Sequence, residues 1–593
     1  MKRLILLVIA VSFVATMFYN VGDKSPKKIG DSKETGSVMQ NTKGSSNYEP
    51  RSLALDTTGK VPGLTGYYDY YTNGNNLHRI WVSGDTVIVS VDQTDSANCQ
   101  TSTARRSYYQ YTTNNGVTWA SDPILVSSDG NAYPNLTPMV ISGSRTVVLS
   151  GRQFISGGRR GYVGSDVILG AGSITNTLVN TGLGSDNFGE PINANELGCG
   201  WLGGGTADTI YFAKFNVTTN TYSTPIPLFT GVPANARTYT AANGNNVVTI
   251  GYWNATAPTS LRFKTSTDGG TTFGSEVTAI TEGLVVNGTA VAPWFNDDLI
   301  YQPGTSKLCL AFGTLLTGNF GTAGGYKLMF WSPSVNSGNP VRIADYQNFP
   351  SMADTNVFND RLRNIQVGFT AMSHPGLAFS QDGTRLYVVY SGVQLDTVNS
   401  TNYSGDGSYN YNDIYVQYSD DGGATWNAPR NLTNTPDVDE VYPSISRTGN
   451  TTTAISLFYA VSQCPGSTSF TNTTTPRCKV WQVYKKYNPV TGAVIGIQNV
   501  SNEVPSGFSL KQNYPNPFNP STKIRFSVPK ASNVTISVYD VTGKLVATLA
   551  DNQQVTAGVK EVEFSAANLS SGIYFYTMKA GEFSETKKMI LVK

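Results

Sequence analysis

A turn followed by a β-branched strand recurs seven times along this chain, and this repetition restricts the fold more than any other feature. Each copy places glycine, proline or polar turn residues a few positions before a run of strand-forming side chains. The copies are GDTVIVSV from Gly84, GSRTVVLS from Gly143, GGGTADTIYFA from Gly203, NGNNVVTIGY from Asn243, PGTSKLCLAF from Pro303, DGTRLYVVY from Asp382 and GNTTTAISLFY from Gly449. Short apolar runs bounded by such turns are typical of β-strands.

The copies predict a β-propeller over residues 61–500. They lie 40 to 80 residues apart, a spacing that suits propeller blades with loops of variable length. Their apolar residues are consecutive, as expected of strands that pack on both faces between neighbouring sheets. A solenoid would need a shorter and stricter period. We expect an all-β propeller of seven blades, or six if one copy is a loop hairpin.

A second repeat has the pattern Ser/Thr-x-Asp-x-Gly-x-Thr-aromatic. It occurs at residues 112–119, 266–273 and 419–426, and we call these three segments the turn octets. The third position holds an Asp or Asn that accepts hydrogen bonds from turn amides, the fifth a glycine for an unusual backbone shape, and the eighth an aromatic plug. These positions are Asn114, Gly116 and Trp119; Asp268, Gly270 and Phe273; and Asp421, Gly423 and Trp426.

The turn octets resemble the Asp-box, or BNR repeat, of sialidases and other Asp-box propellers. The resemblance implies that each octet joins the third and fourth strands of a blade, on the side away from the ligand site. We therefore expect a structural role for the octet carboxylates. One fold hosts many activities, so the octets say little about function.

Residues 505–593 have a different sequence pattern from the repeats. A proline-rich entry at 513–520 precedes about seven short alternating strands, which predict a small immunoglobulin-like β-sandwich. Tyr514-Pro515-Asn516-Pro517-Phe518, Val538 to Gly543, Leu569 to Tyr574 and Lys587-Lys588-Met589 follow one another in order. In these motifs the segment resembles the type A C-terminal sorting domain of the type nine secretion system. The resemblance implies recognition by that machinery and export across the outer membrane.

The N-terminus has the features of a secretory signal. Lys2 and Arg3 precede a short apolar run from Leu4 to Phe18. We predict a signal peptide over residues 1–20, a disordered linker over 21–60 that is poor in large apolar side chains, and export to the periplasm. With the sorting domain, this predicts a secreted or outer-surface protein that is not an integral membrane protein.

Charge and cysteine content exclude several classes of function. The 42 basic and 40 acidic residues nearly balance, so nucleic acid is not an expected partner. Only two histidines and no closely spaced cysteine pair argue against a metal site, and no cofactor is expected. Cys464 and Cys478 flank one loop, and a disulfide between them is predicted, whereas the pairing of the other three cysteines stays open.

No catalytic set can be assigned from the sequence. The weak candidates are Asp297, Asp298, Asp345, Asp354, Arg342 and Arg361. Asp297 or Asp298 with Asp345 or Asp354 would give a paired-carboxylate glycosidase, whereas loop aspartates more commonly cap turns. The sialidase Phe/Tyr-Arg-Ile-Pro signature is missing, and Val341 to Ala344, which reads Val-Arg-Ile-Ala, matches it only in part. Whether the protein is an enzyme stays open.

The leading hypothesis is a propeller that binds an extracellular glycan, polymer or protein through its loop-rich face. A sialidase-like glycoside hydrolase and a structural or adhesive surface component are the alternatives. Convergent arginines would favour the sialidase, two facing carboxylates a glycosidase, and an aromatic-lined groove a binding protein.

Overall fold

The computed structural model describes residues 59–67, 78–95, 97–98, 101–141, 143–156, 158–179, 186–191, 196–202, 209–233, 236–244, 246–317, 326–345, 371–393, 411–435, 438–463, 479–501, 503–566 and 569–593. Within these ranges the chain forms strands β1 to β40 and two short 3-10 helices, η1 (Ser102–Ala104) and η3 (Asn336–Gly338). No helix in the described part of the chain is long and apolar enough to cross a membrane. The predicted signal peptide and nearly all of the predicted linker lie outside the described residues.

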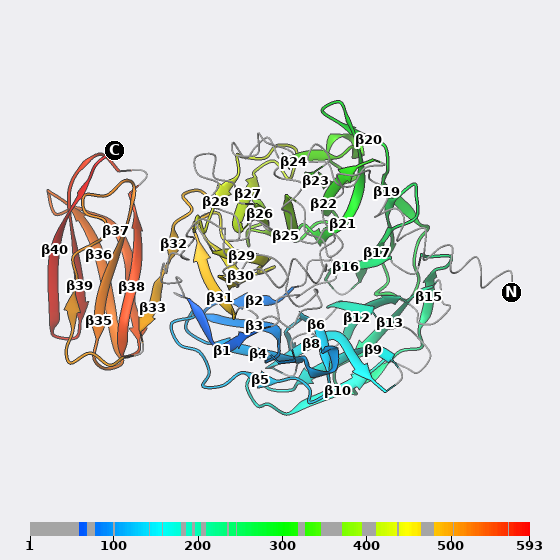
Figure 1. The fold of residues 1–593 in the computed structure, drawn as a ribbon, viewed down its shortest axis with the longest axis horizontal. Helices are drawn as coiled ribbons and strands as arrows, with labels where there is room; N and C mark the ends of the chain where they lie inside the picture. Colours follow the sequence, from blue (N-terminus) through cyan, green and yellow to red (C-terminus); the bar gives the residue numbers. More distant parts are fainter. Residues whose placement is uncertain are drawn as a thin grey trace, which may run out of the picture.

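Seven antiparallel sheets, counted over the described residues, stand in a ring (Figure 1). Sheet 1 contains β2 (Ile80–Ser83), β3 (Thr86–Gln93), β4 (Arg106–Thr112) and β5 (Ile124–Leu125). Sheet 2 contains β6 (Asn131–Leu136), β7 (Met139–Ile141), β8 (Ser144–Ile155), β9 (Gly158–Asp166) and β10 (Ile174–Leu178). Sheet 3 contains β11 (Asp186–Pro191), β12 (Glu196–Leu202), β13 (Ile210–Asn216), β14 (Thr221–Tyr222) and β15 (Ile226–Phe229).

The remaining sheets follow in chain order around the ring. Sheet 4 contains β16 (Arg237–Asn243), β17 (Val247–Asn254), β18 (Ser260–Ser266) and β19 (Val277–Thr281). Sheet 5 contains β20 (Leu284–Val286), β21 (Thr289–Tyr301), β22 (Leu308–Leu316), β23 (Lys327–Trp331) and β24 (Val341–Asp345). Sheet 6 contains β25 (Met372–Phe379), β26 (Leu386–Val393), β27 (Asn412–Ser419) and β28 (Arg430–Asn431). The predicted all-β propeller is confirmed.

Sheet 7 closes the ring with strands from both ends of the propeller. It contains β29 (Asp439–Ile445), β30 (Ile455–Ser462), β31 (Val480–Tyr487) and β32 (Val494–Ile495), together with β1 (Lys60–Gly66). β1 comes first in the chain but pairs antiparallel with β31. Its side chains Val61 and Leu64 are fully buried. Pairing the first strand with the last sheet joins the two ends of the ring, here called the seam.

Apolar side chains fill the spaces between neighbouring sheets. One cluster joins Leu261 of sheet 4 to Leu310 of sheet 5, and another joins Val389 of sheet 6 to Leu457 of sheet 7. These strands are buried on both faces, which explains why their sequences are apolar on consecutive residues.

Four of the seven turn-and-strand copies lead into the second strand of a sheet, β3, β17, β26 or β30. The copies from Gly143, Gly203 and Pro303 lead into β8, β13 and β22, which two strands precede in their sheets. In sheet 3 the second strand is β12, whose sequence ELGCGWL is rich in glycine and lacks a β-branched run.

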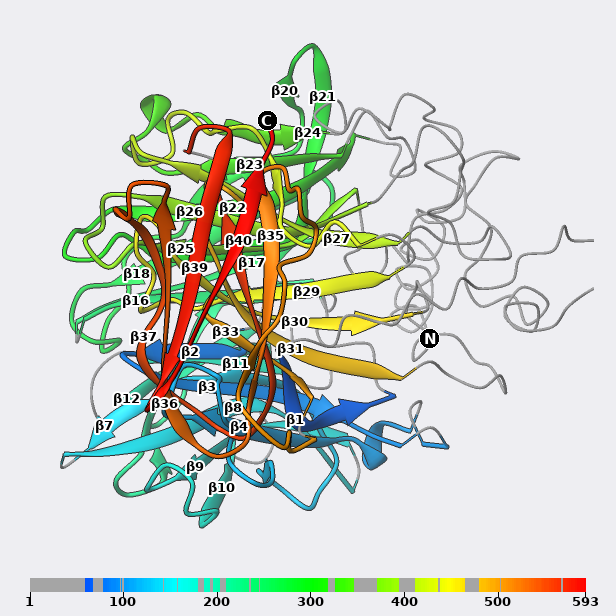
Figure 2. The same ribbon diagram turned by 90° about the vertical axis from the view of Figure 1, so that its left-hand side faces the viewer.

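The C-terminal segment forms two further sheets that face each other. One contains β33 (Ile497–Ser501), β34 (Ser509–Leu510), β35 (Ser521–Val528) and β38 (Gly558–Ser565), and the other β36 (Ser532–Asp540), β37 (Leu545–Val555), β39 (Gly572–Ala580) and β40 (Phe583–Leu591). A single apolar cluster contains Phe526 and Val562 of the first sheet and Ile536 and Tyr576 of the second. Residues 497–500, which the sequence analysis places in the propeller, belong to this sandwich as part of β33. Figure 1 shows this sandwich beside the ring, and in Figure 2 its orange and red strands lie in front of the ring.

Candidate functional site

The turn octets share one hydrogen-bond pattern. In the octet 419–426, the Ser419 hydroxyl donates to Asp421 Oδ1 at 2.7 Å and accepts from the Gly423 amide at 2.7 Å. Asp421 also accepts from the Thr425 amide at 2.9 Å and from its hydroxyl at 2.6 Å. The equivalent bonds occur in the octet 266–273. In the octet 112–119 the side chain of Asn114 replaces the carboxylate.

These bonds stabilise the charged form of the octet carboxylates. Burial raises the pKa of Asp421, but the hydrogen bonds from Thr425 and Ser419 outweigh this effect and lower it to about 2. The hydrogen bonds that Thr272 donates similarly lower the pKa of Asp268. A carboxylate that is bound within its own turn is poorly suited to act as a catalytic acid, which supports a structural role.

Each octet packs against an aromatic ring of the preceding sheet. The fifth-position glycines have φ values of 84° (Gly116), 81° (Gly270) and 102° (Gly423). A Cβ at these positions would lie 2.7 Å from Tyr484, 2.5 Å from Phe212 and 2.1 Å from Phe330, respectively. The octet aromatics contact the same rings, with centroid distances of 5.8 Å for Trp119–Tyr484, 5.1 Å for Phe273–Phe212 and 5.5 Å for Trp426–Phe330. The octets therefore fasten neighbouring sheets together.

All three octets lie at one end of the sheets. Each connects a third strand to a fourth, β4 to β5, β18 to β19 and β27 to β28. The hairpins between first and second strands share this end, because the Asn115 amide donates to the Asp85 carbonyl and the Gly269 amide to the Asn246 carbonyl. The loops that enter the first strands lie at the opposite end.

Three first strands carry the same distortion. β6, β25 and β29 each shift register where an aromatic or imidazole residue precedes a proline. These residues have left-handed backbones, with φ values of 62° for Tyr133, 55° for His374 and 55° for Tyr442. Such conformations are unfavourable for residues other than glycine, and they gather at ligand and catalytic sites.

The distorted strands bring rings and buried arginines together. The rings of His374 and Tyr442 lie 4.5 Å apart between centroids. Arg79 donates a hydrogen bond to the Tyr442 carbonyl. The guanidinium of Arg152 lies 5.0 Å from the centre of the Tyr133 ring. Each of these residues is less than 4% exposed.

Asp92 of β3 lies between Tyr133, whose amide it bonds, and Arg79, with which it interacts electrostatically. Its carboxylate accepts hydrogen bonds from the Tyr133 amide and the Ser107 hydroxyl, both at 2.6 Å. Burial raises its pKa to about 6, against the opposing effects of these bonds and of Arg105 and Arg79. We call Arg79, Asp92, Tyr133, Arg152, His374 and Tyr442 the inner-strand cluster. It combines flat rings, two cations and a carboxyl with a raised pKa in one buried group of side chains.

Asp298 serves as a tie between sheets. Its Oδ1 lies 2.9 Å from Arg447 Nη2 and 3.6 Å from His78 Nε2, and its Oδ2 accepts from the Leu377 amide at 2.6 Å. Arg447 Nε in turn donates to His78 Nδ1 at 3.0 Å. The carboxylate therefore joins segments of sheets 5, 6 and 7 and the entry to sheet 1.

Asp297 has no such partner. Its side chain is 1% exposed, and neither carboxyl oxygen has a hydrogen-bond partner among the described residues. Burial, with the neighbouring charge of Asp298, raises its pKa well above the ordinary value. This environment favours the protonated form of Asp297.

The structure separates the other carboxylate candidates. Asp345 lies on β24 and forms an ion pair with Arg342. Two strands stand between β24 and β21, which carries Asp297, a separation of about 14 Å. A glycosidase pair needs roughly 5–10 Å. Asp354 and Arg361 lie outside the described residues.

The described residues include only some of those on which the cysteine and metal predictions depend. Cys464 and Cys478 lie outside the described residues, so their predicted disulfide stays a prediction. Cys309 is a buried free thiol. No group of three or more His, Cys, Asp or Glu side chains in the described ranges is placed to hold a metal ion.

Sequence reasoning did not single out three members of the inner-strand cluster, Arg79, Tyr133 and Tyr442. The available signal was the repeated pair of a ring residue and proline: Tyr133-Pro134, His374-Pro375 and Tyr442-Pro443. Only the folded ring shows that these pairs occupy equivalent first strands.

Comparison with known proteins identifies the family of the C-terminal segment. Residues 512–593 match the family described as secretion system C-terminal sorting domain. The chain ends in a sorting domain. The predicted resemblance to type nine sorting domains is thereby confirmed, and the sorting domain implies export, followed by secretion or attachment to the cell surface. In the structure, the sandwich that contains it begins earlier, at β33.

Several solved structures are similar to this chain at low sequence identity, and no curated protein sequence matches it. A polysaccharide lyase, ulvan lyase bound to a GlcA(1-4)Rha3S saccharide, has 10% identity and a TM-score of 0.43 over 72% of this chain and 95% of its own. The NanB sialidase of Streptococcus pneumoniae has 10% identity and a TM-score of 0.32 over 56% and 67%. The β-propeller domain of the trilobed protease of Pyrococcus furiosus has 7% identity and a TM-score of 0.32 over 70% and 97%. No activity follows from similarities at this level.

Proposed function

We propose that this protein is a secreted β-propeller that binds an extracellular glycan at the inner-strand cluster. The main support is the left-handed backbone shared by Tyr133, His374 and Tyr442 on three first strands. Such a conformation costs about 1–3 kcal/mol per residue and persists where the surrounding structure enforces it. Three repetitions within one ring are difficult to explain by packing alone.

The chemistry of the cluster suits a sugar ligand. Aromatic rings stack on the apolar faces of sugars, and buried guanidinium groups donate several hydrogen bonds in a fixed geometry. Arg79 and Arg152 supply such groups beside Tyr442 and Tyr133. The loops that enter the first strands lie at the cluster's end of the sheets, so a glycan would approach from the end opposite the turn octets. We propose that these octets are structural Asp-boxes.

Binding can be tested with a panel of neutral and acidic polysaccharides immobilised on an array, followed by calorimetry on any positive glycan. Tyr442→Leu and Arg152→Gln remove a ring and a guanidinium group, and each is expected to weaken binding about tenfold or more, equivalent to about 1.4 kcal/mol. Tyr387→Leu is the matched control, because Tyr387 lies at the octet end, where its hydroxyl bonds the Thr451 carbonyl. Equal affinity in all three variants, or no retained glycan, would contradict the proposal.

One observation favours the alternative of a glycoside hydrolase. Asp92 belongs to the cluster, and burial raises its pKa to about 6, a value suited to proton transfer at neutral pH. Cleavage of a bound glycan, or of chromogenic glycosides and sialosides, that is lost in Asp92→Asn would establish an enzyme. Binding without turnover would leave the protein a binding module.

A further inference from the structure

The sorting domain is joined to the seam of the ring by a very short connection. β32 pairs with β31 of sheet 7, and β33 pairs with β38 of the sandwich. Gly496 is the single residue between these two strands. The Val494 amide also donates to Glu563 Oε2 on β38, at 3.4 Å. The sandwich is therefore anchored directly to the last sheet of the propeller.

The sandwich also contacts the first sheet. Val117, in the octet after β4 of sheet 1, is 6% exposed and belongs to the apolar cluster that forms the core of the sandwich. The same octet position holds Thr271 in sheet 4 and Ala424 in sheet 6, and both are exposed. Only at the seam does this position carry a large apolar side chain that is buried.

The octet that carries Val117 spans the seam. Its Gly116 and Trp119 pack on Tyr484 of sheet 7, and Lys486 of the same sheet donates to Asn115. β1 pairs along the same strand, β31, and the Tyr484 amide donates to the Gly59 carbonyl. Figure 1 shows the sandwich standing beside the place where β1 and β31 meet.

We propose that the sorting domain has a second function as a clamp on the seam of the propeller. The sandwich contacts sheet 7 through β32 and Glu563 and sheet 1 through Val117, so it braces the two sheets that β1 joins. β1 closes the ring and is held in its sheet by pairing to a single strand, β31. Contacts on both sides raise the free energy needed to release it.

Hydrogen exchange of the full chain, followed by mass spectrometry, tests the clamp. We expect Val117→Asp to accelerate exchange of the β1 amides roughly tenfold or more, since burying a charge breaks the apolar contact. Val117→Thr, which copies the octet of sheet 4, should give a smaller increase. Ala424→Asp, at the same position away from the seam, is the matched control and should leave β1 exchange unchanged.

Amides of β17, on the far side of the ring, distinguish a local opening from general loss of stability. Acceleration confined to β1 and its partner β31 supports the clamp. Unchanged β1 exchange in Val117→Asp, an equal effect in Ala424→Asp, or parallel acceleration of β17 would overturn it. If Val117→Asp does not fold, Val117→Thr decides by the same comparison.

Discussion

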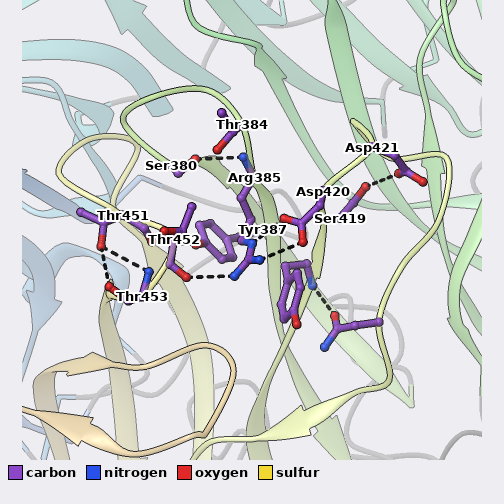
Figure 3. A network of polar contacts seen from close by, with 12 residues as sticks. Ser380, Thr384, Arg385, Tyr387, Ser419, Asp420, Asp421, Thr451, Thr452 and Thr453 are labelled. Carbon is purple, nitrogen blue, oxygen red and sulfur yellow. Dashed lines mark hydrogen bonds and ion pairs between the residues drawn. The ribbon is translucent and has the colours of Figure 1, made fainter. Parts of the chain in front are cut away.

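Arg385 and Asp420 form a two-point ion pair that links β26 to the octet turn of the same sheet. Arg385 Nε lies 2.6 Å from Asp420 Oδ1, and Nη2 lies 2.8 Å from Oδ2 (Figure 3). The remaining guanidinium nitrogen donates to the Thr452 carbonyl of sheet 7 at 2.9 Å. The guanidinium also lies 4.0 Å from the centre of the Tyr418 ring. Arg385 therefore joins sheet 6 to sheet 7, whereas Asp420 contributes only to the pair.

This difference predicts unequal effects of removing the two partners. Arg385→Ala should lower stability by about 1–2 kcal/mol, because it removes the bond to Thr452 and the contact with Tyr418 as well as the ion pair. Asp420→Asn should cost less than about 0.5 kcal/mol, since the Asp420 side chain is 58% exposed. Thermal unfolding at low and high salt measures both. The idea fails if the two variants are equally destabilised, or if salt removes the Arg385→Ala effect.

Gly423 and Gly383 make a matched pair for testing how the octets hold the sheets. Both have positive φ, 102° and 69°. A Cβ on Gly423 would lie 2.1 Å from the Phe330 ring of sheet 5, whereas one on Gly383 would meet only the Pro303 carbonyl at 3.8 Å. Gly423→Ala should therefore cost about 3 kcal/mol or more, and Gly383→Ala about 1 kcal/mol from backbone strain alone. Similar melting temperatures for the two variants would contradict the proposed contact.

Asp297 gives the chain a predicted pH dependence. Its pKa is raised by burial and then by the charge of Asp298, so folding takes up a proton once the pH exceeds the unfolded value near 4. This cost grows as the pH rises towards the folded pKa. Asp297→Asn should therefore match the wild type near pH 4 and melt a few degrees higher at pH 8.

The neighbouring residue provides the opposite control. Asp298 is bonded to Arg447 and to the Leu377 amide, so Asp298→Asn should lower the melting temperature at pH 8. Melting curves from pH 4 to pH 8 compare the two variants. A lower melting temperature for Asp297→Asn at pH 8 would show that its carboxylate is stabilised.

The local elements of the fold were predictable because their causes lie within a few residues. The octets close through bonds between positions one, three, five and seven, so their sequence is enough to identify the turn. The strands of the sandwich were similarly visible, with Lys523 to Val528 inside β35 and Gly572 to Met578 inside β39. Alternating side chains and turn residues carry this information directly.

The inner-strand cluster was not predictable for the opposite reason. His374 and Tyr442 are 68 positions apart in the sequence, and their rings meet because β25 and β29 are the first strands of neighbouring sheets and each shifts register at this residue. No sequence pattern within either segment predicts that the two rings are in contact. The rings against which the octets pack could not be predicted from the sequence for the same reason. They belong to Tyr484, Phe212 and Phe330.

The amino-acid sequence by itself determined the strands, the turns, the repeated architecture and the sorting domain, because these depend on short-range periodicity and turn chemistry. The tertiary structure decided which side chains meet: the pairing of β1 with β31, the tie between Asp298 and Arg447, and the burial of Val117 in the sandwich. Such contacts form only when the ring closes, since closure brings the two ends of the propeller to one place.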